Sequence, residues 1–184
     1  QNAVSIYDFG VSRDGLLYCA MELVDGVTLS QLLSYDPNIP IERAMHFLYQ
    51  VSSALQEAHS LQLVHRDIKP QNLKLTDNGQ IVLLDFGLAK GSPAEAGNQT
   101  AAKSVFGYSR NYASLEQIQG TGTDPRSDLY ALAATLYHLV TGEPPADALT
   151  RATSVLSKKP DPLVPAHLIR DEVPKGFAAV LHNA

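Results

Sequence analysis

The sequence has little of what several large classes of protein require. Its 184 residues include no tryptophan, one cysteine and two methionines. A lone cysteine cannot form an internal disulfide, and Cys19 lies in an apolar run. We therefore expect Cys19 to be buried as a small hydrophobic side chain in a reducing compartment. The formal charge of -5 lacks the basic excess typical of nucleic-acid binding, so we expect no nucleic-acid partner.

Long hydrophobic runs are also missing. A membrane-spanning helix needs about 20 consecutive apolar residues, and the longest candidate, residues 129–140, is interrupted by polar side chains such as Thr135 and His138. The sequence opens on Gln1-Asn2 without a basic leader. We expect no signal peptide, no membrane contact by this segment and a cytoplasmic location, with any membrane anchor of the parent protein outside it.

Local patterns predict a mixture of short strands and longer helices. The expected strands are residues 4–9, 16–23, 63–64, 73–75 and 81–84. The expected helices are residues 28–33, 41–58, 129–140 and 146–157, and one that starts near residue 173. Thr28 is a candidate helix cap, and Thr76-Asp77-Asn78-Gly79 is a strong hairpin turn. The helix at 129–140 has almost no polar face and should be buried nearly all round, whereas residues 91–104 are small, polar and aperiodic, which is typical of a mobile loop.

Two motifs carry candidate chemistry. The first motif, His65-Arg66-Asp67-Ile68-Lys69-Pro70-Gln71-Asn72, lies between the expected strands at 63–64 and 73–75. The second, Asp85-Phe86-Gly87, directly follows the expected strand at 81–84. Either motif alone would be weak evidence, because a lone Asp on a loop is usually a turn former or a cap. In this order, with Lys and Asn at their offsets, they resemble the catalytic and metal loops of eukaryotic-like protein kinases.

Phosphoryl transfer explains why these residue types are needed. The reaction depends on positioning and charge neutralisation more than on covalent chemistry. Asp67 is the candidate to orient the acceptor hydroxyl and receive its proton, and Lys69 can donate to the transferring group. Asn72 and Asp85 offer the oxygen ligands that Mg²⁺ or Mn²⁺ prefers. The resemblance therefore implies ATP and a divalent metal as cofactors.

The resemblance extends to the nucleotide side of the site. Met21-Glu22-Leu23-Val24 looks like the hinge that joins the two lobes of a kinase, where backbone groups of Glu22 and Val24 would bind the adenine edge. Plain core packing is the alternative for Met21. Lys74 stands where relatives often place an apolar residue under the adenine, which is a departure. Its aliphatic stem could still lie along the ring, with the ammonium group displaced to water.

The later part of the chain resembles the region that supports a kinase catalytic loop. Residues 112–117 are similar to the end of an activation segment, with Leu115 in place of the usual proline. Asp128 resembles the buried aspartate that anchors the catalytic-loop backbone, although a simple helix cap is the alternative. Arg66 is typical of kinases ordered by a phosphate on the activation loop. Thr100 and Ser104 are the candidate acceptors of that phosphate. The alternative is that both are ordinary loop residues without a phosphate.

The resemblance implies an α+β protein kinase-like fold, mainly the helical C-lobe with the last strands of the N-lobe. Residues 1–24 would be the end of the N-lobe and the hinge, and residues 25–184 the C-lobe, truncated before its last helix. No GxGxxG motif and no strand Lys precede the hinge, so we expect the isolated segment to be inactive.

Three functional hypotheses stay open from the sequence. In the first, the full-length parent, of bacterial type, phosphorylates Ser or Thr of a protein substrate, with a kinase dimer left open. Lys69 favours Ser/Thr over Tyr as the acceptor. A pseudokinase or truncated kinase-fold scaffold is the alternative. A small-molecule phosphotransferase is disfavoured by the segment at 112–117 and by Asp128.

Overall fold

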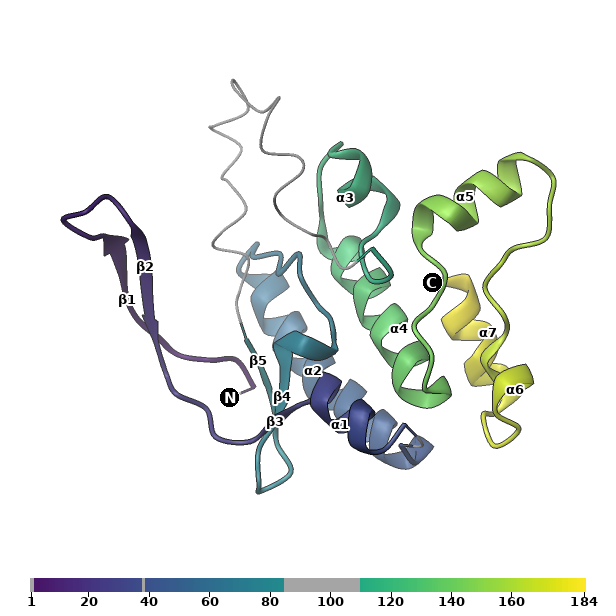
Figure 1. The fold of residues 1–184 in the computed structure, drawn as a ribbon, viewed down its shortest axis with the longest axis horizontal. Helices are drawn as coiled ribbons and strands as arrows, with labels where there is room; N and C mark the ends of the chain where they lie inside the picture. The colour runs from purple at the N-terminus through teal and green to yellow at the C-terminus, as the bar shows by residue number, and fades with distance from the viewer. Residues whose placement is uncertain (1, 38, 85–109) are drawn as a thin grey trace.

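The structure is a computed structural model that describes residues 2–37, 39–84 and 110–184 (Figure 1). The expected loop at 91–104, Asp85, Thr100 and Ser104 lie outside the described residues. A β-rich part formed by the first strands is followed by a body of helices, as the α+β prediction requires. Among the described residues, no helix is both long and apolar enough to cross a membrane.

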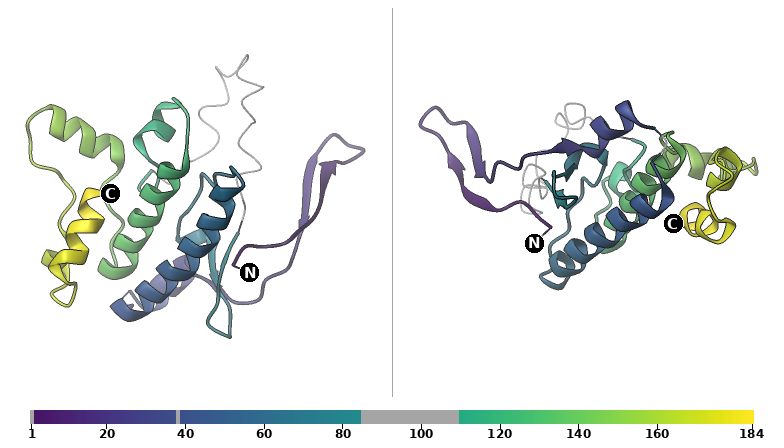
Figure 2. Two further views of the ribbon diagram at one scale, coloured as in Figure 1. Left: turned by 180° about the vertical axis from the view of Figure 1, so that it is seen from behind. Right: turned by 90° about the horizontal axis from the view of Figure 1, so that it is seen from below.

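An antiparallel hairpin opens the chain. It consists of β1 (Ile6–Val11) and β2 (Leu17–Met21), and it stands away from the helices in all three views (Figures 1 and 2). Both of its faces are exposed: Leu17 is 85% accessible to solvent, and its neighbour Tyr18, on the other face, is 46% accessible. The prediction that Cys19 is buried was therefore wrong. An apolar run is compatible with a strand that packs under another element, but no described element packs over this hairpin.

A second, three-stranded sheet lies at the base of the hairpin. Its strands β3 (Val27–Thr28), β4 (Leu73–Leu75) and β5 (Ile81–Leu83) pair antiparallel in the order β3-β4-β5. The chain enters β3 through Gly26, whose φ of +132° and close approach to β4 exclude a side chain, since a Cβ there would lie 2.1 Å from the carbonyl oxygen of Leu75. The expected strand at 63–64 is absent, because those two residues have no strand to pair with and follow the helix end as irregular backbone.

Helix α1 (Leu29–Tyr35) begins at Thr28, as the sequence predicts. The Thr28 side chain accepts a hydrogen bond from the backbone N–H of Gln31, and the Gln31 side chain accepts one in return from the Thr28 N–H. This reciprocal capping box satisfies two N–H groups that would otherwise lack partners at the helix start. The 3₁₀ turn η1 (Pro70–Asn72) lies against α1 and leads into β4.

Two long helices form the centre of the body. Helix α2 (Ile41–Ser60) turns an apolar face that includes Phe47, Val51 and Leu55 toward α4 (Pro125–Thr141). Helix α4 is capped by Asp124 and ends at Gly142, in a left-handed conformation with φ +75°. Most of α4 is buried as expected, although Leu129 remains 54% exposed. This central position makes α4 a rigid support for the loops around it.

The remaining helices are short and surround α4. They are α3 (Leu115–Gln119), α5 (Ala148–Leu156), α6 (Ala166–Ile169) and α7 (Lys175–Asn183). The predicted helices near 146–157 and 173 are confirmed as α5 and α7. Helices α6 and α7 pack against α4, and α3 packs against α5. One apolar core runs from the small sheet through α2 and α4 to α7, so the loops that meet at the top of α4 rest on a common base.

Candidate active site

The loop between α2 and β4 brings three of the predicted catalytic side chains together. The Lys69 ammonium lies 2.9 Å from Oδ2 of Asp67. The side-chain amide of Asn72 donates to the same Oδ2 at 3.0 Å and to the Asp67 backbone oxygen at 2.8 Å. Asp67 and Lys69 are only 26% and 17% exposed. The carboxylate of Asp67 is therefore held in one orientation by a cation and an amide.

A buried imidazole joins this loop to β5. His65 is fully buried, and its Nδ1 accepts the backbone N–H of Asp67 at 3.2 Å. Its other ring nitrogen therefore carries the proton and donates to the carbonyl oxygen of Leu84 at 2.8 Å. The N–H of Leu84 in turn donates to the carbonyl oxygen of Asn72 at 2.8 Å. Since Leu84 directly precedes Asp85, these bonds fix the point at which the second motif leaves the sheet.

Asp128 on α4 anchors the backbone of the same loop. Its carboxylate accepts the N–H groups of His65 and Arg66, each at 2.8 Å, and contacts Nε2 of His59 at 2.8 Å. Asp128 is fully buried, so these donors compensate for the loss of water around its charge. The cap of α4 is Asp124, which rules out the alternative that Asp128 is a simple cap.

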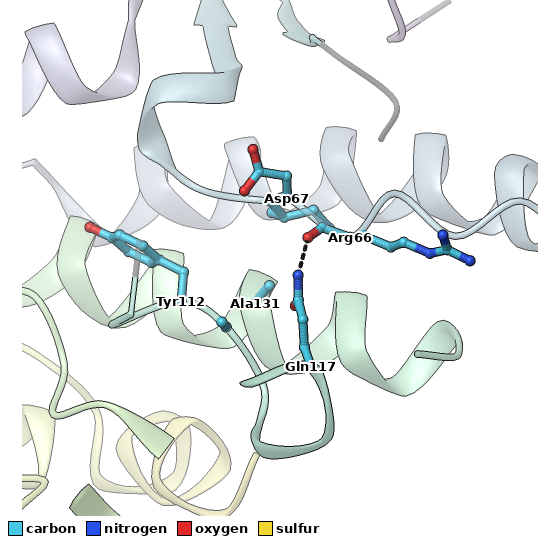
Figure 3. Close-up of a pocket in the computed structure, with 7 residues that line it drawn as sticks. Arg66, Asp67, Tyr112, Gln117 and Ala131 are labelled. Atoms are coloured by element: carbon cyan, nitrogen blue, oxygen red, sulfur yellow. Dashed lines mark hydrogen bonds between the residues drawn. The ribbon is translucent and has the colours of Figure 1, made fainter. Parts of the chain in front are cut away.

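The segment before and within α3 forms the opposite wall of the site. The Gln117 side chain donates to the carbonyl oxygen of Arg66 at 2.6 Å, which ties this wall to the catalytic loop (Figure 3). Arg66 adopts a left-handed backbone with φ +69°, a conformation that costs free energy in a residue other than glycine. A small cavity lies between loop and wall, and Asp67, Tyr112 and Ala131 are among its lining residues.

The other predicted site residues lie in β4, beyond the end of β2 or outside the described residues. Lys74 is half-buried in the central strand β4, between Thr28 and Val82. Glu22 is exposed and Val24 half-buried beyond the end of β2, and the Glu22 N–H donates to the carbonyl oxygen of Ser5 at 2.8 Å. Asp85 is not among the described residues. The structure thus brings Asp67, Lys69 and Asn72 into contact and leaves the roles of Glu22, Val24, Lys74 and Asp85 as predictions.

Sequence reasoning missed several supporting residues. His59 lies in the last turn of α2, six positions before His65, and its contact with Asp128 spans 69 residues of chain. Gln117 lies within the recognised segment, but no pattern in the sequence indicates its hydrogen bond to the carbonyl oxygen of Arg66. The position of His59, six residues before His65, was the one feature of the sequence that could have suggested a role beside the catalytic loop.

A loop that combines Asp67, Lys69 and Asn72 and is anchored by a helix aspartate defines the catalytic part of a protein kinase. Residues 1–169 match the protein kinase domain, and the chain belongs to this family. Serine/threonine-protein kinase PknB of Mycolicibacterium smegmatis is 34% identical over 183 residues, which are 97% of this chain and 29% of that kinase. PrkC of Bacillus subtilis is 39% identical over 146 residues, 79% of this chain and 22% of that kinase.

A probable serine/threonine-protein kinase of Clostridium perfringens is also similar, at 34% identity over 183 residues. It matches 100% of this chain, and the match covers 26% of the relative. The chain therefore spans about a quarter of the length of the curated relatives it matches. The likeness to bacterial serine/threonine kinases confirms the family resemblance seen in the sequence.

Proposed function

We propose that the protein containing this chain transfers the γ-phosphoryl group of ATP to Ser or Thr hydroxyls of protein substrates. The observation that carries the proposal is the convergence of Lys69 and Asn72 on the carboxylate of Asp67, in a loop pinned to the strand that leads into Asp85. Residues 1–24 would then end the N-lobe and form the hinge, and residues 25–184 would form the C-lobe.

Each residue has a distinct role in this proposal. Asp67 orients the acceptor hydroxyl and takes its proton, because Lys69 and Asn72 hold its carboxylate in one orientation. Lys69 lies 2.9 Å from Asp67, where its ammonium can also donate to the group in transfer and offset the negative charge that develops there. A fixed carboxylate and a fixed cation meet the requirement for pre-organised positioning in phosphoryl transfer.

The donor set fits a divalent cation. The amide nitrogen of Asn72 makes both bonds to Asp67, so its amide oxygen is the atom left to face a metal. Together with the carboxylate of Asp85, Asn72 would hold Mg²⁺ or Mn²⁺, which prefer oxygen ligands. When bound, the metal neutralises charge on the phosphates. The backbone of Glu22 and Val24 would bind the adenine edge, and the stem of Lys74 would lie along the ring.

The charge of the chain and its family indicate the kind of substrate and the cellular location. An acidic chain of formal charge -5 suits neither DNA nor RNA, and we propose that this stretch works in the cytoplasm on protein substrates. A dimer of the complete kinase is compatible with this proposal. An inactive kinase-fold scaffold is the second candidate function, but the ordered contacts of Asp67, Lys69 and Asn72 do not favour it.

The proposed activity is tested by transfer of label from γ-labelled ATP to a generic protein substrate such as myelin basic protein or casein. The longest natural form of the protein that contains this chain should be used. We expect label on Ser and Thr after acid hydrolysis, at a rate that depends on Mg²⁺ or Mn²⁺. Nucleotide binding without any transfer, under conditions in which PrkC is active in parallel, would favour the scaffold.

The metal assignment gives a separate prediction. Asn72→Ala and Asp85→Asn should each raise the Mg²⁺ concentration needed for half-maximal activity by about tenfold or more, because each removes one of two protein ligands. Asp67→Asn is the matched control for metal-dependent nucleotide binding, because Asp67 faces the acceptor. Equal metal dependence of nucleotide binding in all three variants and the wild type would exclude this site.

The 184-residue chain by itself should bind Mg-ATP poorly and show no transfer. The hairpin that precedes the proposed hinge is exposed on both faces, and a nucleotide held from one side keeps its phosphates in water, where screening weakens each contact. Isothermal titration with Mg-ATP measures this directly. Micromolar affinity of the isolated chain would show that the described residues hold the nucleotide without help.

A further inference from the structure

A partly buried hydrogen bond beside the catalytic loop has no role in the proposal so far. Tyr112 Oη lies 2.6 Å from Nδ1 of His138, and the two rings stack with centroids 6.2 Å apart and planes inclined by 23°. Burial raises the pKa of Tyr112 to about 12 and lowers the pKa of His138 from its ordinary 6.5. Near neutral pH the tyrosine therefore keeps its proton and the imidazole is neutral, so we assign the O–H as donor and Nδ1 as acceptor.

This bond holds a residue that lines the cavity beside Asp67. Tyr112 and Asp67 are both lining residues of that cavity, and Tyr112 is only 7% exposed (Figure 3). The wall that contains Tyr112 has three other side-chain tethers. The Asn111 side chain donates to the carbonyl oxygen of Pro145 at 2.7 Å, the Gln117 side chain donates to Arg66, and the Ser127 hydroxyl of α4 donates to the Glu116 carboxylate of α3. Of these four tethers, the one to His138 is made by an imidazole, whose pKa is lowered by burial from 6.5.

We propose that His138 is a positioning residue for the acceptor substrate, since it holds Tyr112 in the wall of the cavity beside Asp67 and releases this wall when its ring is protonated. The inference rests on the proposed kinase function and concerns its regulation by pH. Protonation at Nδ1 removes the acceptor of the Tyr112 O–H and places a charge in a partly buried position. Both effects favour separation of the two rings and a looser wall.

Burial, and not a neighbouring charge, lowers the pKa of His138. Tyr112 is the titratable group in contact with the ring. Glu143 follows α4, Asp147 caps α5, and Arg170 reaches the carbonyl oxygen of Val140 near the end of α4, but none of these three alters the pKa of His138. Because the folded-state pKa lies below the unfolded value, the contribution of the neutral ring is fully present above pH 6.5. It is lost as the pH falls through the folded-state pKa.

The test compares pH profiles of kcat/KM for a peptide substrate in wild type, His138→Asn and His138→Leu. The oxygen of Asn stands close to the position of Nδ1 and accepts without titrating. His138→Asn should keep most of the activity at about pH 8 and lose less of it than wild type at about pH 5.5. His138→Leu and Tyr112→Phe should each lower kcat/KM by up to about tenfold at pH 8, the effect of one hydrogen bond, mainly through the KM of the peptide.

Several outcomes separate this inference from the proposed function. No transfer by wild type at any pH overturns the kinase proposal, and this inference with it. An active wild type whose decline in acid is the same in His138→Asn assigns that decline to a group other than His138. This result overturns the role of His138 and leaves the kinase proposal standing. A change in the KM for ATP equal to that for the peptide would also overturn it. Thermal unfolding at each pH serves as the folding control, and Tyr112→Phe provides a second variant if His138→Leu fails to fold.

Discussion

Asp67→Asn abolishes phosphoryl transfer while nucleotide binding stays close to that of wild type. The substitution keeps the shape of the side chain but removes the negative charge that Lys69 contacts at 2.9 Å and the base that receives the acceptor proton. Loss of a general base costs about 10²–10⁴-fold in rate. Because Asp67 acts on the acceptor hydroxyl in the proposed mechanism and not on ATP, the effect should be on kcat, with little change in the affinity for Mg-ATP.

The measurement is single-turnover transfer to a peptide, paired with a nucleotide-binding titration. Asp77→Asn is a matched control, because Asp77 is exposed in the turn between β4 and β5, at a distance along the chain from the catalytic loop. It should leave both quantities unchanged. If Asp67→Asn retained most of its kcat, Asp67 would have no role as base, and orientation by Lys69 and Asn72 would need another explanation.

Local rules predicted the elements whose causes are local. The Thr28 cap and the turn after β4 each depend on a few adjacent residues. The strand expected at 63–64 failed because a strand needs a partner, and two apolar residues do not indicate one. The predicted burial of Cys19 was wrong for a related reason, since burial of a strand depends on what packs over it and not on its own sequence.

The candidate site likewise has a part that depends on adjacent residues and a part that depends on distant ones. The spacing of Asp67, Lys69 and Asn72 places them on one short loop, so the sequence could predict that they act together. Their supports come from distant segments. His59 and Asp128 are 69 positions apart, and Tyr112 and His138 are 26 apart. Only packing of α2 and of the wall against α4 brings these pairs together, and no local pattern indicates that packing.

Asp128→Ala should release the backbone of the catalytic loop from α4. We expect it to give the largest loss of stability of any substitution discussed. It leaves the N–H groups of His65 and Arg66 without their buried acceptor, and it removes the partner of His59. Loss of one partner from a buried charged network costs about 3–5 kcal/mol in the free energy of unfolding. Arg66 adopts an unfavourable backbone conformation with φ +69°, so without the anchor it should relax and displace Asp67.

Asp128→Asn separates the anchoring role from simple loss of volume. The amide keeps one oxygen acceptor but presents an NH₂ group where Asp128 accepts a second donor, so we expect a smaller loss of about 1–3 kcal/mol. Displacement of Asp67 by about 1 Å would lower activity about 10²-fold even in the folded fraction. Denaturant unfolding and single-turnover transfer measure the two effects. Asp171→Asn, an exposed control, should change stability by less than about 0.5 kcal/mol. Wild-type stability and activity in Asp128→Asn would show that the loop holds its conformation without this anchor.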